Sequence, residues 1–360
     1  MKADKKTRDL AKEAGVSLNG PVSYVMDNEK TKAEQKQESK KRLEIMDIKE
    51  ALKKYSWLKG YMWKLVKKDK DKYTKSIAKS FDGGYFIRIF KNQKIDFPIQ
   101  ACMLIKSSNY EQKVHNIIIA EENSSAHIIN GCASEITAAK PKHYAVSEYY
   151  IEKNAKLMFT MVHSWNKETK VRPRTAVTVG DNASYVSNYI TTKEVDDIQS
   201  YPVVYCNGTN SKAYLNSILF AKKSSFMDIG SELVLNGANS SGEIISRTIA
   251  KDSAEIIARG RITGNNNTAK GHLECMSLLI GDKAKTSSIP ELKATKQCVL
   301  SHEAAVGKLA DREIEYIMSR GVPEDEAKSI LIRGFLDTKI LHLPENITKA
   351  IDSIIKSTVE

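Results

Sequence analysis

The chain has 360 residues, 41% of them hydrophobic, so it can bury a substantial core in one large domain or two moderate ones. No apolar run reaches the roughly 18 residues of a membrane span, and the amino terminus MKADKKTRDL lacks the apolar core of a signal peptide. Five scattered cysteines argue against a disulfide framework. We therefore expect a cytoplasmic protein from a reducing compartment, with no membrane partner.

The net charge of +12 is concentrated in residues 1–80, which hold 22 Lys and Arg against 12 Asp and Glu. Residues 28–55 are rich in Glu, Lys and Gln and carry a weak apolar stripe, so we predict a helix there. A second helical piece is predicted over residues 57–78, before Gly83-Gly84. Lys is interleaved with acidic residues and no nucleic-acid motif accompanies it, so a solvated helical face is favoured over a nucleic-acid partner.

From residue 81 to residue 305 the chain predicts a solenoid. Short β-rich runs alternate with polar turns, and long helical patterns are absent. A small residue closes successive turns at Ala126, Ala155, Ala183, Ser225, Ser240, Ala254, Thr268 and Ala284. Most of the steps are multiples of about 14 residues, whereas the turns of a β-sandwich need not keep a period. The prediction is a mainly β fold, a parallel β-helix of two sheets with coils of about 28 residues.

The last segment, residues 306–360, predicts a helical domain. Helical spacing covers residues 311–319, a second helix begins at Pro323 and ends near Arg333-Gly334, and a third begins at Pro344. We expect these helices to cap the solenoid and to offer a docking surface.

Residues 271–307 contain the main candidate metal ligands of the chain. Cys275 and Cys298 lie in two apolar runs, and His302-Glu303 follow directly. The spacing is not that of a zinc ribbon, so these side chains could converge only through the fold. Cys298 precedes His302 by four residues, and strand alternation would place both on one face.

The same stretch resembles the SufB/SufD family of SUF-type iron–sulfur cluster assembly scaffolds. The residues that carry the resemblance, with weaker fragments upstream, are Gly83-Gly84, Asp96-Phe97-Pro98-Ile99-Gln100, Gly131-Cys132, Ser164-Trp165-Asn166, Tyr201-Pro202, Cys275-Met276-Ser277-Leu278-Leu279-Ile280-Gly281, Pro290, Ser301-His302-Glu303-Ala304-Ala305-Val306-Gly307, Tyr316, Ser319-Arg320-Gly321, Glu326-Ala327 and Gly334-Phe335. The Glu after His302 is similar to SufB more than to SufD.

The resemblance implies a right-handed parallel β-helix flanked by helical ends. It implies pairing with a second copy or a SufD-like paralogue, and docking of a SufC-type ABC ATPase on the C-terminal helices, where Ser319, Arg320, Gly321, Gly334 and Phe335 match the family. Cys275 matches the position that receives sulfur and ligates a nascent cluster, and His302 and Glu303 match paired interface residues. The cargo would be a transient cluster of the 4Fe-4S or 2Fe-2S type, destined for apo iron–sulfur proteins.

Sulfur entry is where the chain departs from the family. The family cysteine that follows Tyr-Pro by two residues is Val204 here, and Cys206 lies two residues further on and could substitute. Sulfur would come from a cysteine desulfurase system or from sulfide. Cys298 is a further candidate ligand, whereas Cys102, Cys132 and Trp165 are expected to be packing residues, which is also the ordinary fate of a buried cysteine such as Cys275.

The resemblance implies a non-catalytic scaffold subunit. The sequence has no Gly-x-x-x-x-Gly-Lys-Ser/Thr phosphate-binding loop, so we expect that this chain does not hydrolyse ATP itself. Two other classes stay open. A polysaccharide-acting β-helix enzyme would need secretion and carboxylates clustered with arginine, and a metal-free interaction solenoid would hold no cluster.

Overall fold

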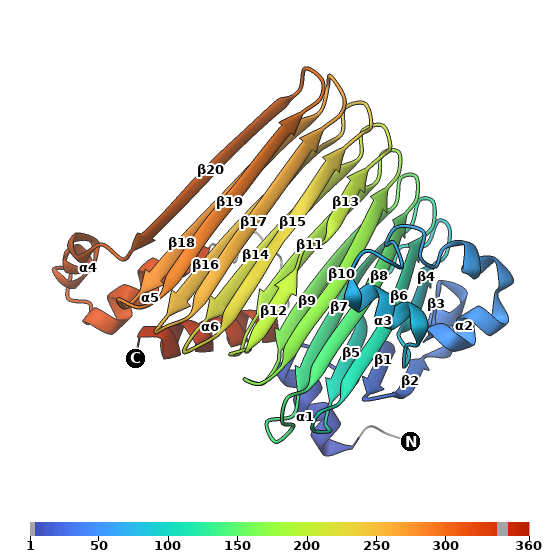
Figure 1. The fold of residues 1–360 in the computed structure, drawn as a ribbon, viewed down its shortest axis with the longest axis horizontal. Coiled ribbons are helices and arrows are strands. Elements are labelled where there is room, and N and C mark those ends of the chain that lie inside the picture. The colour runs from blue at the N-terminus through green and yellow to red at the C-terminus, as the bar shows by residue number, and fades with distance from the viewer. Residues whose placement is uncertain (1–3, 337–344, 360) are drawn as a thin grey trace.

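The computed structural model describes residues 4–336 and 345–359, and its centre is a flattened parallel β-solenoid (Figure 1). Sheet A has the strand order β2-β1-β5-β7-β9-β11-β14-β16-β18-β20, and sheet B has the order β19-β17-β15-β12-β10-β8-β6-β4-β3, with β13 beside β10 and β15. The chain alternates between the two sheets from β4 onward, except at β12 and β13, which together fill one position. This arrangement confirms the predicted two-sheet parallel β-helix.

The bounds of the strands are as follows. Sheet A contains β1 (Val22–Asp27), β2 (Lys30–Gln35), β5 (Ile99–Ile105), β7 (Ser125–Ser134), β9 (Lys156–Ser164), β11 (Ser184–Thr191), β14 (Lys212–Ala221), β16 (Ser241–Lys251), β18 (Lys270–Ile280) and β20 (Val299–Lys308). Sheet B contains β3 (Leu43–Asp47), β4 (Tyr85–Ile89), β6 (Glu111–Ala120), β8 (Lys142–Ile151), β10 (Lys170–Val179), β12 (Asp197–Ser200), β13 (Val203–Cys206), β15 (Phe226–Leu235), β17 (Glu255–Gly264) and β19 (Lys285–Ala294).

The coils keep a nearly constant length. Lys212, Ser241 and Lys270 pair in register across three strands of sheet A, each one coil after the last. Paired strand residues on successive coils lie from 27 to 31 residues apart. The predicted coil of about 28 residues is therefore confirmed, with small insertions at individual turns.

Asparagine ladders hold the turns together. Asn92, Asn123 and Asn154 have positive φ, which asparagine adopts more readily than other residues that carry a Cβ atom. Asn123 Nδ2 donates to Asn92 Oδ1 at 2.8 Å, and Asn154 Nδ2 donates to Asn123 Oδ1 at 2.8 Å. A second ladder of the same kind joins Asn182, Asn210 and Asn239. The polar turn that recurs in the sequence is thus a structural unit of each coil.

The N-terminal region differs from the prediction. Its helices are α1 (Lys5–Glu13), α2 (Ile48–Lys54) and α3 (Lys72–Lys79), with 3-10 turns η1 (Gln37–Lys41) and η2 (Ser56–Gly60). The helix predicted over residues 28–55 was wrong except for α2, because β2, η1 and β3 lie in the remainder of that stretch. Leu43 and Ile45 of β3 alternate with period two and bury against the core beside β4, which outweighs the helical composition. The piece predicted over residues 57–78 is helical only at η2 and α3.

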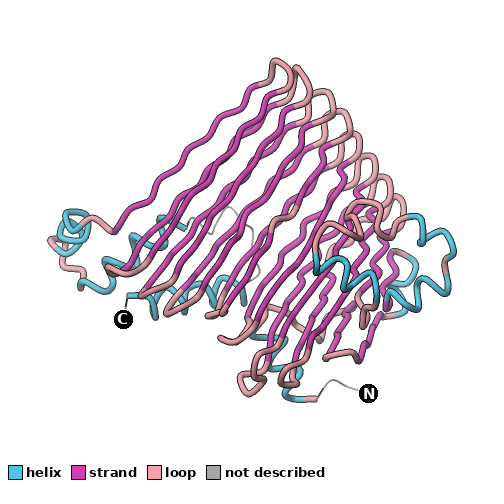
Figure 2. The backbone as a smooth tube through the Cα atoms, viewed as in Figure 1, coloured by secondary structure: helices cyan, strands magenta, loops and turns pink. Residues whose placement is uncertain are grey.

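The C-terminal helices α4 (Asp311–Met318), α5 (Glu324–Leu336) and α6 (Glu345–Val359) form close to the predicted ranges, although Pro344 lies outside the described residues. The prediction that they cap the solenoid was wrong. Ile332 of α5 and Ile351 of α6 pack on the outer face of sheet A beside Ile218 and Ile249. The apolar face of α6 packs against the outer face of sheet A and not against the end of the solenoid. The last coil is therefore left uncovered (Figure 2). None of the helices in the described ranges is both long enough and apolar enough to cross a membrane.

Candidate functional site

The last coil of the solenoid is open. Within the described ranges β20 pairs with β18 on one edge only, and its residues are exposed except for the half-buried Leu300 (Figure 1). On the opposite sheet β19 pairs only with β17 and is likewise mostly exposed. Strands without a neighbour present unpaired N–H and C=O groups, so this end can accept another chain.

Cys275 lies one strand inside this open end. It is on β18, fully buried in the lumen core, and in register with Ala304 of β20. Burial raises the pKa of the Cys275 thiol, the Ser288 hydroxyl acts against this rise, Glu274 adds to it, and Arg247 acts against it. The side chain faces the lumen, and a single strand separates it from the open edge.

The register of β18 and β20 divides the two adjacent candidate ligands. His302 pairs with Leu273, and Glu303 pairs with Glu274. Since side chains alternate along a strand and paired residues of parallel strands face the same way, His302 shares the lumen side with Cys275, whereas Glu303 lies on the outer face. His302 is two residues along from the partner of Cys275, a Cα separation of about 8 Å for ideal strands. The fold thus places Cys275 and His302 on the same face of sheet A. Glu303 of the same chain lies on the opposite face.

Hydroxyl groups line the lumen beside Cys275. Thr286 Oγ1 and Ser288 Oγ on β19 are buried, and the Ser288 hydroxyl interacts with the Cys275 thiol. Thr286 is in register with Ile256 and Ser288 with Ala258, both buried lumen residues. The alternation of Thr286, Ser288 and Pro290 along the sequence could have indicated that these residues face the lumen, but no such prediction was made from it. Across the described residues, no group of three His, Cys, Asp or Glu side chains already has metal-site geometry.

Cys298 lies just before β20, not within it. It is half-buried, packs with Leu300 against the lumen core, and has its Sγ 3.9 Å from Gly264 O. Cys298, Leu300 and His302 therefore follow one face, in agreement with the predicted alternation.

Cys206 is remote from this end. It lies on β13 of sheet B, in register with Val179 and Leu235, and is fully buried. Burial raises its pKa to about 12, with the Ser211 hydroxyl acting against the rise. Val204 faces the same lumen core, as alternation predicts, but β15 and β17 separate β13 from β19. The structure does not bring Cys206 beside Cys275.

The remaining cysteines pack as predicted. Cys132 and Trp165 lie in the lumen core, and Cys102 lies beneath α1 and the C-terminal helices on the outer face of sheet A. Burial raises the pKa of Cys132 to about 12.

The predicted docking residues fall in two places. Ser319, Arg320 and Gly321 form the turn between α4 and α5, where Gly321 has φ +86°. Gly334 and Phe335 lie in the last turn of α5. The exposed apolar side chains of this helix pair are Tyr316, Met318 and Ile330. These apolar side chains are therefore left uncovered by the rest of the described chain.

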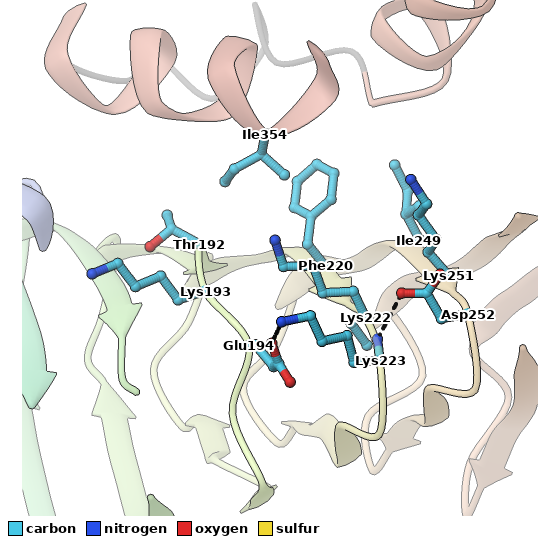
Figure 3. A pocket seen from close by; sticks show the side chains of 11 residues that line it. Thr192, Lys193, Glu194, Phe220, Lys222, Lys223, Ile249, Lys251, Asp252 and Ile354 are labelled. Carbon is cyan, nitrogen blue, oxygen red and sulfur yellow. Dashed lines mark hydrogen bonds and ion pairs between the residues drawn. The ribbon is translucent and has the colours of Figure 1, made fainter. Parts of the chain in front are cut away.

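A separate pocket of about 230 Å³ lies between α6 and the turns of sheet A (Figure 3). Phe220, Ile249 and Ile354 line its apolar part. Lys223 Nζ bridges to Glu194 at 3.0 Å within it. None of the candidate cluster ligands lines this pocket, so it is distinct from the open end.

Fold and site together define a class: a parallel β-solenoid with a lumen cysteine next to an open terminal coil. The sequence profile described as SUF system FeS cluster assembly, SufBD core domain, matches residues 103–335. The chain belongs to the SufBD family, and it therefore has a part in iron–sulfur cluster assembly.

Individual relatives agree. The chain is 49% identical over 307 residues to an iron–sulfur cluster assembly SufBD family protein of Methanothermobacter thermautotrophicus (strain Winter), covering 84% of this chain and 75% of the relative. It is 45% identical over 319 residues to a SufBD family protein of Archaeoglobus fulgidus, covering 88% of this chain and 84% of the relative. It is 32% identical over 323 residues to a SufBD family protein of Pyrococcus horikoshii, covering 89% of this chain and 72% of the relative.

Proposed function

We propose that this protein is the scaffold on which an iron–sulfur cluster is assembled and from which it passes to apo-proteins. The observation that carries the proposal is the placement of Cys275 and His302 on the same side of β18 and β20, beside the open edge. In this proposal residues 81–305 form the scaffold core, residues 306–360 the ATPase-docking domain, and residues 1–80 a basic flanking region of open role.

The ligand types suit a cluster that is cargo. A thiolate from Cys275 is a strong ligand for iron, whereas the imidazole of His302 and the carboxylate of Glu303 exchange more readily. Mixed ligation holds a 4Fe-4S or 2Fe-2S cluster without the closed cage of four thiolates. The cluster can then leave when the weaker ligands dissociate.

A second chain would complete the site. Two-fold pairing through β20 juxtaposes each ligand set with its symmetry mate, with Cys275 and His302 on the lumen side and Glu303 on the outer face of both copies. Exposed Val299 and Val306 give this edge apolar area to bury. The partner is a second copy of this chain or a SufD-like paralogue.

We further propose that a SufC-type ABC ATPase docks on residues 311–336 and that this chain is the non-catalytic subunit. Tyr316, Met318 and Ile330 provide the apolar docking surface, and Ser319, Arg320, Gly321, Gly334 and Phe335 shape it. The complex would work in the cytoplasm.

Sulfur delivery has two candidate routes. Cys206 would accept persulfide from a cysteine desulfurase system, although its buried thiol must first be exposed. Direct delivery to Cys275, or sulfide as the source, would act next to the open end, although the Cys275 thiol is buried as well and must also be exposed. Cys298 is half-buried near the open end and is a candidate accessory ligand.

Anaerobic reconstitution with ferrous iron and sulfide tests the scaffold role. The wild-type chain should gain the visible absorbance of a cluster and pass it to an apo-ferredoxin, and a metal-free interaction solenoid would gain none. Co-purification with the ATPase is a separate measurement. Tyr316→Asp with Ile330→Asp should abolish it and leave reconstitution intact, and unchanged co-purification would place the docking surface elsewhere. Point variants are preferable to deletion of residues 308–360, because a deletion would strip α5 and α6 from the apolar face of sheet A.

A further inference from the structure

Arg247 lies where the carboxyl end of α5 meets sheet A. Its Nε donates to the carbonyl oxygen of Phe335 at 3.1 Å, and its guanidinium lies 5.9 Å from the centroid of the Phe335 ring. The last carbonyls of a helix have no partner within the helix and carry its negative partial charge, so a guanidinium is a favourable ligand for them. Arg247 thus fixes the end of α5 to strand β16.

The same guanidinium holds a carboxylate on the next strand. Arg247 Nη2 lies 2.6 Å from Glu274 Oε1 on β18, and the two side chains are only 18% and 17% exposed. Its remaining nitrogen, Nη1, is buried and has no hydrogen-bond partner among the residues that the structure describes. Because α5 shields this ion pair from water, the attraction between its charges is stronger than it would be at an exposed site.

Glu274 is in turn the neighbour of Glu303. The two glutamates pair in register on β18 and β20 and share the outer face of sheet A. Like charges on directly adjacent strands repel, and the charge of Arg247 offsets that repulsion. A chain of contacts therefore connects the end of α5 to Arg247, Arg247 to Glu274, and Glu274 to β20, the strand that carries both His302 and Glu303.

We propose that Arg247 is a positioning residue that couples α5 to β20. While α5 covers Arg247, the Arg247–Glu274 pair is shielded and β20 lies firmly beside β18. When a docked partner draws α5 away, water enters, the pair weakens, and repulsion between Glu274 and Glu303 loosens β20. Movement at the docking helices would then open the ligand-bearing strand, which is how nucleotide-driven motion could time cluster release. This inference rests on the proposed roles of α5 and Glu303.

Amide hydrogen exchange of β20 in the full chain tests the coupling. Arg247→Gln should speed exchange in residues 299–308 by about tenfold or more, since β20 loses its electrostatic support. Arg247→Gln with Glu274→Gln should return exchange to within about twofold of wild type, because the repulsion is removed as well. Phe335→Ala should produce a smaller increase that Glu274→Gln abolishes.

Arg259→Gln is the matched control. Arg259 forms an equivalent ion pair with Asp228, at 2.5 Å, on sheet B, and its loss should leave β20 unchanged. The coupling is overturned if Arg247→Gln leaves β20 exchange unaltered, or if the increase persists in the double variant. If Arg247→Gln does not fold, Glu274→Gln alone provides the test. This variant removes the repulsion between residues 274 and 303, so the proposal requires that it slow amide exchange in β20. No iron or ATPase is present, so a chain that failed to assemble a cluster would overturn the proposed function and leave this result standing.

Discussion

The two ends of the solenoid are built in opposite ways. At the first end, β2 is a six-residue edge strand that carries Lys30 and Lys32, and it pairs antiparallel with β1. At the last end, β20 is a ten-residue parallel strand with Val299 and Val306 exposed. Short, charged edges resist pairing with another chain, whereas long apolar edges invite it.

The coverings of the two ends differ as well. Ile48 of α2 and Leu58 of η2 pack on the first coils of sheet B, beside Phe86 and Ile117. The C-terminal helices could have covered the last coil in the same way, yet they run along the side of sheet A. A solenoid needs a closed end to be stable, so one end that stays open points to a partner.

The largest expected effect comes from the buried carboxylate near the first end. Glu148 is fully buried, accepts the backbone N–H groups of Trp63 and Leu65 at 2.5 and 2.6 Å, and lies 2.8 Å from His115 Nε2. Glu148→Ala leaves these groups without a partner and should lower the unfolding free energy by about 3–5 kcal/mol. Chemical denaturation measures this. The control Glu303→Ala, at the open end, should change stability by less than about 0.5 kcal/mol.

The next effect concerns association. Val299→Asp with Val306→Asp places charge on the apolar edge of β20, and should weaken dimerisation at least about 100-fold, close to 2.7 kcal/mol. Light scattering over a concentration series measures it. Ile136→Asp is the control, because Ile136 is 90% exposed but lies far from β20 in the strand order. A dimer that tolerated the Val pair and dissociated on the Ile136 change would move the interface away from the open end.

The pH dependence of stability should come from mid-solenoid histidines. Burial lowers the pKa of His143 and of His163 to about 3, and His143 adds to the lowering at His163. The unfolded chain takes up these protons below about pH 6.5 and the folded chain does not, so stability is complete above that pH and falls as the pH drops toward 3. Each histidine should contribute up to about 2 kcal/mol of loss between pH 7 and pH 5.

Substitution tests this assignment. His163→Gln should flatten the slope of unfolding free energy against pH in this window, whatever its effect on absolute stability. Cys132→Ala, a buried lumen change that removes no group titrating between pH 5 and pH 7, should leave the slope as it is. An equal flattening by both changes would contradict the assignment of the slope to the buried pair.

The smallest effect should be on cluster retention. His302→Ala removes one exchangeable ligand, so we expect release of the cluster to an apo-ferredoxin to quicken a few-fold without loss of assembly. Stopped-flow absorbance follows the transfer. An unchanged rate would remove His302 from the ligand set.

Sequence reasoning reached the solenoid because the polar turn of each coil repeats, as the Asn92 to Asn154 ladder shows. It failed at β3, where lysine-rich composition hid the period-two burial of Leu43 and Ile45. It also failed on the cap, because the apolar stripe of α6 fits an outer sheet face as well as a solenoid end. At the candidate site, the sequence predicted that Cys275, His302 and Glu303 converge. The opposite orientation of Glu303 depends on the register of β18 and β20, which no local pattern fixes.

The most direct test of the open end as the cluster site compares two buried lumen cysteines. Cys275 and Cys132 are both nearly inaccessible to solvent and belong to the same core cluster, but only Cys275 lies next to the open edge. Anaerobic reconstitution of Cys275→Ala should give no cluster absorbance while dimerisation and ATPase binding persist, and Cys132→Ala should reconstitute like the wild type. A wild-type cluster yield from Cys275→Ala would contradict the placement of the site at the last coil.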